Sequence, residues 1–92
     1  GVPKICLPQL VPSEYNYGSI KYDDFIIPLQ IVIGDQQAAL IGQGGFKTGS
    51  VAMNFGTSGS VQINAGQQPV HIDGLISSVL FSNANERLYL LE

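Results

Sequence analysis

A short apolar run from Leu29 to Ile33 is the strongest hydrophobic signal in the first half of the chain. It is rich in β-branched residues, begins after Pro28 and ends at Gly34. Continuous apolar runs of this length, bounded by residues that favour turns, are typical of strands covered on both faces. The pattern therefore predicts a buried strand of a parallel or mixed sheet.

The polar residues that follow this run predict a helix with an acidic start. Residues 36–43 are mostly good helix formers, and they end at the glycine pair 44–45, which favours a helix stop. Asp35 lies at the junction of strand and helix, where its carboxylate is expected to cap free backbone N–H groups. The carboxyl edge of a sheet, where this residue would lie, is the edge at which α/β folds bind ligands.

The second half of the chain alternates between apolar and polar residues. Residues 51–55 place Val51, Met53 and Phe55 on one face, and residues 61–64 alternate in the same way. The two runs are joined by the polar, glycine-bearing turn GTSG, which predicts a β-hairpin. Residues 76–81 and 87–91 form a second pair of predicted strands, so we expect a small antiparallel meander.

Prolines at four positions interrupt residues 1–28, which makes extended segments and turns more favourable there than a helix. Residues 5–7 and Ile20 are candidates for brief edge strands, and Cys6 is expected to be a small buried hydrophobe. The adjacent Asp23 and Asp24 would point to opposite faces of an extended chain, so a shared metal ion is unfavourable and a solvated loop is preferred.

Composition narrows the class of protein. Apolar residues make up 45% of the 92 residues and charged residues only 12%, which is more apolar than a free-standing domain of this size needs. We therefore expect a piece of a larger protein. A net charge of −3 with four basic residues argues against nucleic acid as a partner.

The sequence also bears on where in the cell the protein is expected. No apolar run approaches the roughly 20 residues that span a bilayer, and no signal peptide is visible, so we expect no membrane partner. The single cysteine, Cys6, cannot form an internal disulfide, which suits a reducing compartment. We accordingly expect a cytoplasmic protein.

Two stretches carry candidate chemistry. Asp35 has the carboxylate that a general base needs, and the amide of Gln36 can donate to or accept from a hydroxyl group. At the hairpin turn, Gly56 lets the backbone come close to a phosphate and Thr57 adds a hydroxyl donor. The alternatives are structural, because an aspartate at this position can simply cap the helix, a glutamine there can be solvated, and such a turn can be only a turn.

These two stretches resemble the FGGY-type carbohydrate kinases, the family that includes glycerol kinase, gluconokinase and xylulokinase. GDQQAALIGQ is similar to the glycerol kinase segment with the catalytic aspartate, and NFGTSGS is similar to the phosphate-binding turn that follows it. The 22 positions between Asp35 and Thr57 match the family spacing. LPQLVPSEYNYGSI, residues 7–20, is similar to the lead-in to the first motif.

The resemblance implies a fold and a function. The fold would be α/β, a fragment of the two-lobed actin-like, ribonuclease H-like kinase fold, with residues 1–45 ending the first lobe and residues 46–92 beginning the second. The function would be transfer of the γ-phosphoryl group from ATP with Mg²⁺ to a primary hydroxyl of a polyol or sugar. Asp35 would be the base and a substrate ligand, Gln36 a further substrate ligand, and Gly56 with Thr57 would bind the ATP phosphates.

One residue departs from the glycerol kinase pattern. Ser60 stands where glycerol kinases generally carry an aromatic residue three positions after the threonine, and in this respect the turn looks more like gluconate and xylulose kinases. The substrate stays open among polyols and sugars, and the fragment alone is expected to be inactive.

Two other functions remain open. One is a non-catalytic actin-like scaffold that has lost kinase activity, and the other is a self-contained β-rich binding module. A fragment with unpaired strand edges is expected to form a homo-oligomer.

Overall fold

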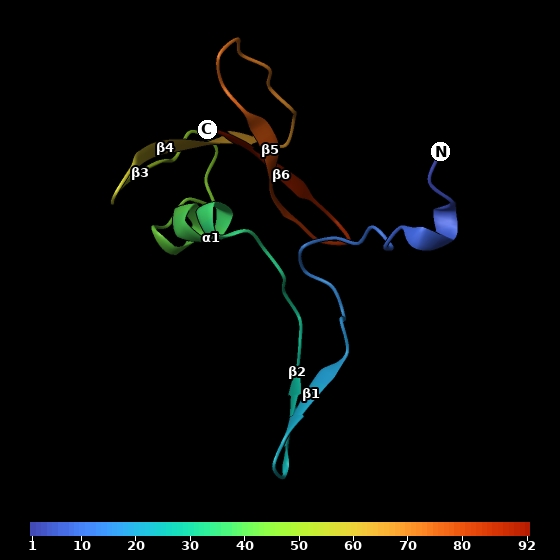
Figure 1. Ribbon diagram of the computed structural model, residues 1–92. Coiled ribbons are helices and arrows are strands. Elements are labelled where there is room, and N and C mark those ends of the chain that lie inside the picture. Colours follow the sequence, from blue (N-terminus) through green and yellow to red (C-terminus); the bar gives the residue numbers. More distant parts are fainter.

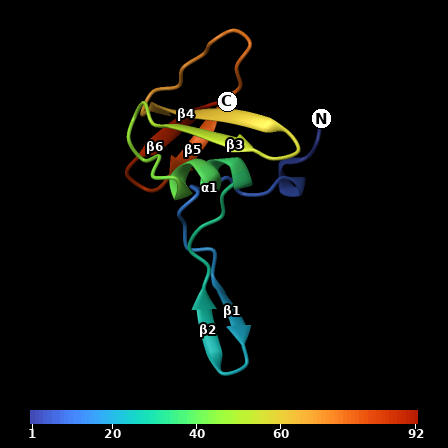
Figure 2. The ribbon, with the colours of Figure 1, turned by 90° about the vertical axis from the view of Figure 1, so that its left-hand side faces the viewer.

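One helix packs against a four-stranded antiparallel sheet, and a two-stranded hairpin projects away from this body (Figure 1). The computed structural model describes residues 1–92. Figure 2 shows α1 beneath β3 and β4, and both of these strands contact the helix. The elements are η1 (Lys4–Cys6), β1 (Ser19–Tyr22), β2 (Phe25–Pro28), α1 (Asp35–Gly42), β3 (Val51–Phe55), β4 (Gly59–Gly66), β5 (Ser77–Ser82) and β6 (Arg87–Leu91).

The predicted helix and both predicted strand pairs of the second half are confirmed. In the β3–β4 hairpin, Phe55 pairs with Gly59 next to the turn and Val51 pairs with Ile63 at the far end. The strand order of the sheet is β3-β4-β6-β5, so the expected meander is wrong in its order although all its pairs are antiparallel. The long loop between β4 and β5 lets β6 insert between them, where it pairs on both edges.

The core lies between the helix and the sheet. Leu40 of α1 is fully buried and clusters with Leu80 and Leu90 of the sheet, along with Ala52, Phe81 and Leu88. Leu40 is the one buried side chain of the helix, and the other apolar residues of α1 are intermediate or exposed. The core therefore depends on contacts between residues far apart in the sequence.

The face of the β3–β4 hairpin that packs against the helix is the polar one. Gln62 and Asn64 of β4 are completely buried on this face, next to Ala52 of β3. The apolar side chains of Val51, Met53 and Phe55 are more than half exposed on the opposite face. The predicted alternation is correct. Burial of the polar face is tolerated because its amides hydrogen-bond to the helix and to the turn after it.

The strand predicted over Leu29 to Ile33 is not present. Only Ile31 makes a bridge there, to Glu14, while the strand of this region is β2, which ends at Pro28. The backbone of residues 29–32 does pair, but on one side only, with residues 13–18. Since no second strand and no covering layer lie beside it, the run stays largely exposed instead of forming a central buried strand.

The first 28 residues follow the expected extended course with local exceptions. Ile20 belongs to β1, as predicted, but residues 4–6 form a turn of 3-10 helix and not an edge strand. Cys6 is exposed, so the expectation of a buried cysteine is wrong. The two aspartates 23 and 24 form the turn of the β1–β2 hairpin.

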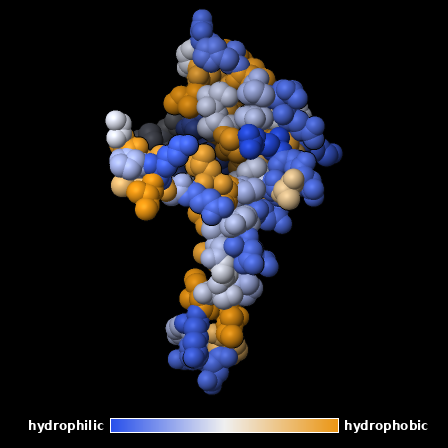
Figure 3. All heavy atoms as spheres, turned by 90° about the vertical axis from the view of Figure 1, so that its right-hand side faces the viewer, coloured by the Kyte–Doolittle hydropathy of each residue, from blue (hydrophilic) through white to orange (hydrophobic).

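Apolar side chains cover much of the projecting β1–β2 hairpin (Figure 3). The register pairs Ile20 with Ile27 and Tyr22 with Phe25, and directly paired residues lie on the same face of a ribbon. All four side chains are at least half exposed. An isolated two-stranded ribbon with an uncovered apolar face is marginally stable in water.

Candidate functional site

Asp35 is the first residue of α1 and is exposed. Gly34, the residue that caps the helix, has no side chain to bind the free N–H groups of the first turn. The Oδ1 atom of Asp35 accepts a 2.8 Å hydrogen bond from the backbone N–H of Gln36. Asp35 thus contacts one free N–H group of the first turn but is not the capping residue, and the prediction that it lies at the carboxyl edge of a sheet is wrong because no strand ends directly before it. The carboxylate keeps further acceptor capacity toward solvent.

Gln36 is held against the sheet. Its Oε1 atom accepts a hydrogen bond of 3.3 Å from the Ser60 hydroxyl and another from Nε2 of Gln62. Both donors belong to β4, so the start of the helix and the strand that follows the hairpin turn are joined through one side chain. The half-buried Gln36 is thus fixed in place, unlike a solvated glutamine of a first helical turn.

A chain of amides extends from this contact along the underside of the hairpin. Nε2 of Gln43 donates to Oδ1 of Asn54 at 3.0 Å, and Nδ2 of Asn54 donates to Oε1 of Gln62 at 3.3 Å. Sequence reasoning did not single out Gln43, Asn54 or Gln62. The available signal was the period-2 pattern, which places polar residues 60, 62 and 64 on one face of a strand.

The hairpin turn presents unused hydrogen-bond donors. Gly56 donates its N–H to the backbone oxygen of Ser58 at 2.9 Å, which closes the turn. The N–H groups of Thr57 and Ser58 donate to no backbone oxygen, and their hydroxyl groups make no hydrogen bond to another side chain. The turn is exposed, and neutral N–H and hydroxyl donors of this kind suit phosphate oxygens.

The two predicted motifs are in contact through the hydrogen bond between Gln36 and Ser60. Gln36 adjoins Asp35, and Ser60 follows Thr57 by three residues, or about 10 Å of extended chain. The hydrogen bond between Gln36 and Ser60 therefore connects a carboxylate with a turn rich in donors. No group of three or more histidine, cysteine, aspartate or glutamate side chains able to hold a metal ion occurs in the structure.

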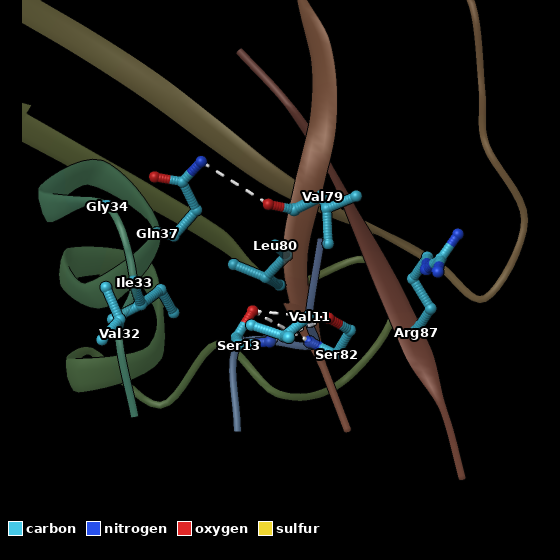
Figure 4. A pocket seen from close by; sticks show the side chains of 10 residues that line it. All are labelled: Val11, Ser13, Val32, Ile33, Gly34, Gln37, Val79, Leu80, Ser82 and Arg87. Carbon is cyan, nitrogen blue, oxygen red and sulfur yellow. Dashed lines mark hydrogen bonds between the residues drawn. The ribbon is translucent and has the colours of Figure 1, made fainter. Parts of the chain in front are cut away.

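A hollow of about 380 Å³ lies beside the start of the helix (Figure 4). Ser13 and Ser82 meet at its base, where the backbone N–H of Ser13 donates to the Ser82 hydroxyl at 3.1 Å. Gln37 reaches across it to the backbone oxygen of Val79 at 3.5 Å. Asp35 does not line this hollow, so the hollow is separate from the predicted site.

None of the helices in the structure has the length and apolar character needed to cross a membrane. No family model matches the chain. The chain is, however, similar along its whole length to glycerol kinases. It is 37% identical over 99 residues to that of Acidiphilium cryptum and 33% identical over 92 residues to that of Saccharolobus islandicus, covering 100% and 99% of this chain. It spans 19% and 18% of those relatives, or about one fifth of their length.

A solved structure gives the same result for the fold. Plasmodium falciparum glycerol kinase, crystallised with ADP, matches 87% of this chain with a TM-score of 0.77 and 34% sequence identity. The match covers 17% of that protein. The chain is therefore an α/β segment of the actin-like, ribonuclease H-like fold. The two relatives and the solved structure are all glycerol kinases.

Proposed function

We propose that this chain, homologous over its whole length to glycerol kinases, is part of an ATP-dependent carbohydrate or polyol kinase. The reaction is transfer of the γ-phosphoryl group of Mg-ATP to a primary hydroxyl of glycerol or of a related polyol or sugar. Phosphoryl transfer needs a donor and an acceptor held in line and stabilisation of the developing charge, more than covalent help from the protein.

The observation that carries the proposal is the hydrogen bond from Ser60 to Gln36, 24 residues apart. It joins the helix start that bears an exposed carboxylate to the strand that follows a turn with free N–H and hydroxyl donors. A base for the acceptor hydroxyl and donors for a phosphate are the two groups that a kinase must bring to one place.

Asp35 is proposed as the catalytic base and as a substrate ligand. Its exposed carboxylate has free acceptor positions, so it can orient a hydroxyl group of the polyol and take its proton as the O–P bond forms. Gln36, fixed by β4, is proposed as a second ligand that hydrogen-bonds a neighbouring polyol hydroxyl. The two side chains together would hold the acceptor in one orientation.

Gly56 and Thr57 are proposed to bind the ATP phosphates. The absence of a side chain at Gly56 lets phosphate oxygens approach the backbone, and Thr57 offers both an N–H and a hydroxyl donor. The free donors of the turn fit this role. Mg²⁺ bound to ATP would neutralise part of the charge that develops on the phosphates.

The proposal extends to the organisation of the protein. Residues 1–45 would end the first lobe and residues 46–92 would begin the second, so the reacting groups would meet in the cleft between lobes. The segment alone would be inactive, because it spans about one fifth of its relatives. We further propose a cytoplasmic homo-oligomer that binds neither nucleic acid nor membrane.

The test is ADP release by the full-length protein with Mg-ATP and, in turn, glycerol, xylulose, gluconate and related polyols. Turnover on one of these substrates should fall about 100-fold or more in Asp35→Asn, the scale expected for loss of a general base. Asp73→Asn, the same change at an exposed loop residue, is the matched control and should keep full activity. No turnover on any substrate, or turnover indifferent to Asp35→Asn, would favour a scaffold without kinase chemistry.

A further inference from the structure

Gln62 is a glutamine with no exposed surface, located on a strand whose apolar face is turned outward. Burial of an amide costs free energy unless its hydrogen bonds are satisfied. A buried strand position that faces a helix is ordinarily occupied by an apolar side chain. Both ends of the Gln62 amide are satisfied, by Asn54 on one side and by Gln36 on the other.

The hydrogen bonds around Gln62 all run in one direction. Gln43 donates to Asn54, Asn54 donates to Gln62, and Gln62 donates to Gln36. The two middle amides, Asn54 and Gln62, each accept at the oxygen and donate from the nitrogen, so the hydrogen bonds polarise one another in the same sense. The chain ends at Gln36, whose oxygen also receives the hydrogen bond of Ser60.

The direction of these hydrogen bonds determines which end of the Gln36 amide is free to bind a ligand. Its oxygen is occupied by two donors, and its Nε2 group makes no hydrogen bond in the structure. A glutamine can in general present either its oxygen or its nitrogen to a ligand. In this structure Gln36 can offer a ligand only its Nε2 donor. The neighbouring Asp35 carboxylate, when ionised, can only accept.

We infer that Gln62 is a positioning residue that fixes Gln36 as a hydrogen-bond donor to the polyol. This inference rests on the proposed kinase function. Asp35 and Gln36 would then bind two adjacent hydroxyl groups of the polyol in different ways. One hydroxyl donates its hydrogen bond to the Asp35 carboxylate, and the oxygen of the other accepts a hydrogen bond from Nε2 of Gln36. Substrates with an oxygen acceptor beside the reacting hydroxyl are favoured, and those lacking that oxygen are rejected.

The experiment uses the full-length protein, the polyol found to be its best substrate and the analogue of that polyol without the neighbouring hydroxyl. In the unsubstituted protein the analogue should have a kcat/KM lower by about 10-fold or more, because Nε2 of Gln36 is left without the oxygen that it donates to. In Gln62→Met, which keeps the volume but cannot donate, KM for the polyol should rise about 10-fold while KM for ATP stays within about 2-fold.

The preference for the polyol over its analogue should shrink in the same Gln62→Met variant, which a purely structural role would not cause. Gln68→Met, the same change at an exposed loop position, is the control and should leave both constants unchanged. Ser60→Ala, which removes the second donor to Gln36, should raise KM for the polyol by about 3-fold and gives an independent reading if Gln62→Met does not fold.

Three outcomes are distinguishable. No turnover by the unsubstituted protein would reject the proposed function itself. Turnover with an unchanged KM and an unchanged preference in Gln62→Met, or in Ser60→Ala where the first variant does not fold, would overturn the positioning role while leaving the kinase function standing. A rise in KM for the polyol but not for ATP, together with a smaller preference for the polyol over its analogue, would establish the positioning role of Gln62.

Discussion

The side-chain Nδ2 of Asn64 donates a 2.8 Å hydrogen bond to the backbone oxygen of Gly45, 19 residues earlier. The Oδ1 atom of the same amide accepts from the N–H of Gly66 at 2.9 Å, so both ends of the fully buried side chain are satisfied. Its backbone pairs as well, with Gly49 and Ser50. Asn64 thus fastens the turn after α1 to strand β4, which keeps the helix in place under the hairpin.

Removing this amide should loosen the helix from the sheet. Asn64→Ala leaves the Gly45 oxygen and the Gly66 N–H without their partners, and we expect a loss of about 2 kcal/mol in the free energy of unfolding. Urea unfolding of the full-length protein measures it. The control Asn85→Ala changes an exposed side chain in the β5–β6 turn and should cost almost nothing; equal effects of the two variants would contradict the role of Asn64.

Two glycines near the end of the helix should respond in opposite ways to alanine. A Cβ atom on Gly45 would lie 2.5 Å from the backbone oxygen of Leu40 and would also meet the Leu40 side chain, so Gly45→Ala should destabilise the protein by about 1–3 kcal/mol. A Cβ atom on Gly42 would meet nothing within 4 Å, and Gly42→Ala should stabilise the helix by about 0.5 kcal/mol.

Melting temperatures of the two glycine variants, compared with the unsubstituted protein, measure both effects. A lower value for Gly45→Ala and a value at or above the original for Gly42→Ala are expected. If Gly45→Ala melts no earlier than Gly42→Ala, then the close approach of the turn to Leu40 is not maintained in solution.

Loss of the Thr57 hydroxyl should weaken nucleotide binding selectively. Thr57→Val keeps the shape but removes one of the free donors of the turn, so KM for ATP should rise about 10-fold while KM for the polyol stays nearly constant. Steady-state kinetics of the full-length protein give both constants. Thr48→Val, the same exchange at another exposed residue, serves as the control; an effect on the polyol alone would place Thr57 at the other ligand.

The 92-residue segment expressed alone should associate with itself. The outer face of the β3–β4 hairpin exposes Val51, Met53 and Phe55, and the β1–β2 hairpin exposes a second apolar face. Exposed apolar faces and unpaired strand edges promote association. Light scattering should give a mass above that of the monomer; a stable monomer with a cooperative melt would instead indicate a self-contained module.

Local chemistry determined the elements that the sequence could predict. The helix of residues 36–43 was visible from its good helix formers and the glycine pair that ends it, and the structure places it at Asp35–Gly42. The β3–β4 hairpin was visible from alternation on either side of a glycine-bearing turn. The two motifs that resemble carbohydrate kinases were also local, and the similarity to glycerol kinases over the whole chain agrees with them.

Tertiary contacts decided what local patterns leave open. Alternation showed that the hairpin has two faces, but the polar face is the buried one because the helix packs against it, where Gln62 and Asn64 hydrogen-bond to the helix and to the turn after it. The run from Leu29 to Ile33 was apolar enough for a buried strand, yet it found a backbone partner on one side only. Likewise, the insertion of β6 between β4 and β5 replaced the expected meander. Period and turn chemistry act over a few residues, whereas burial and pairing depend on which distant segments are available to cover a surface.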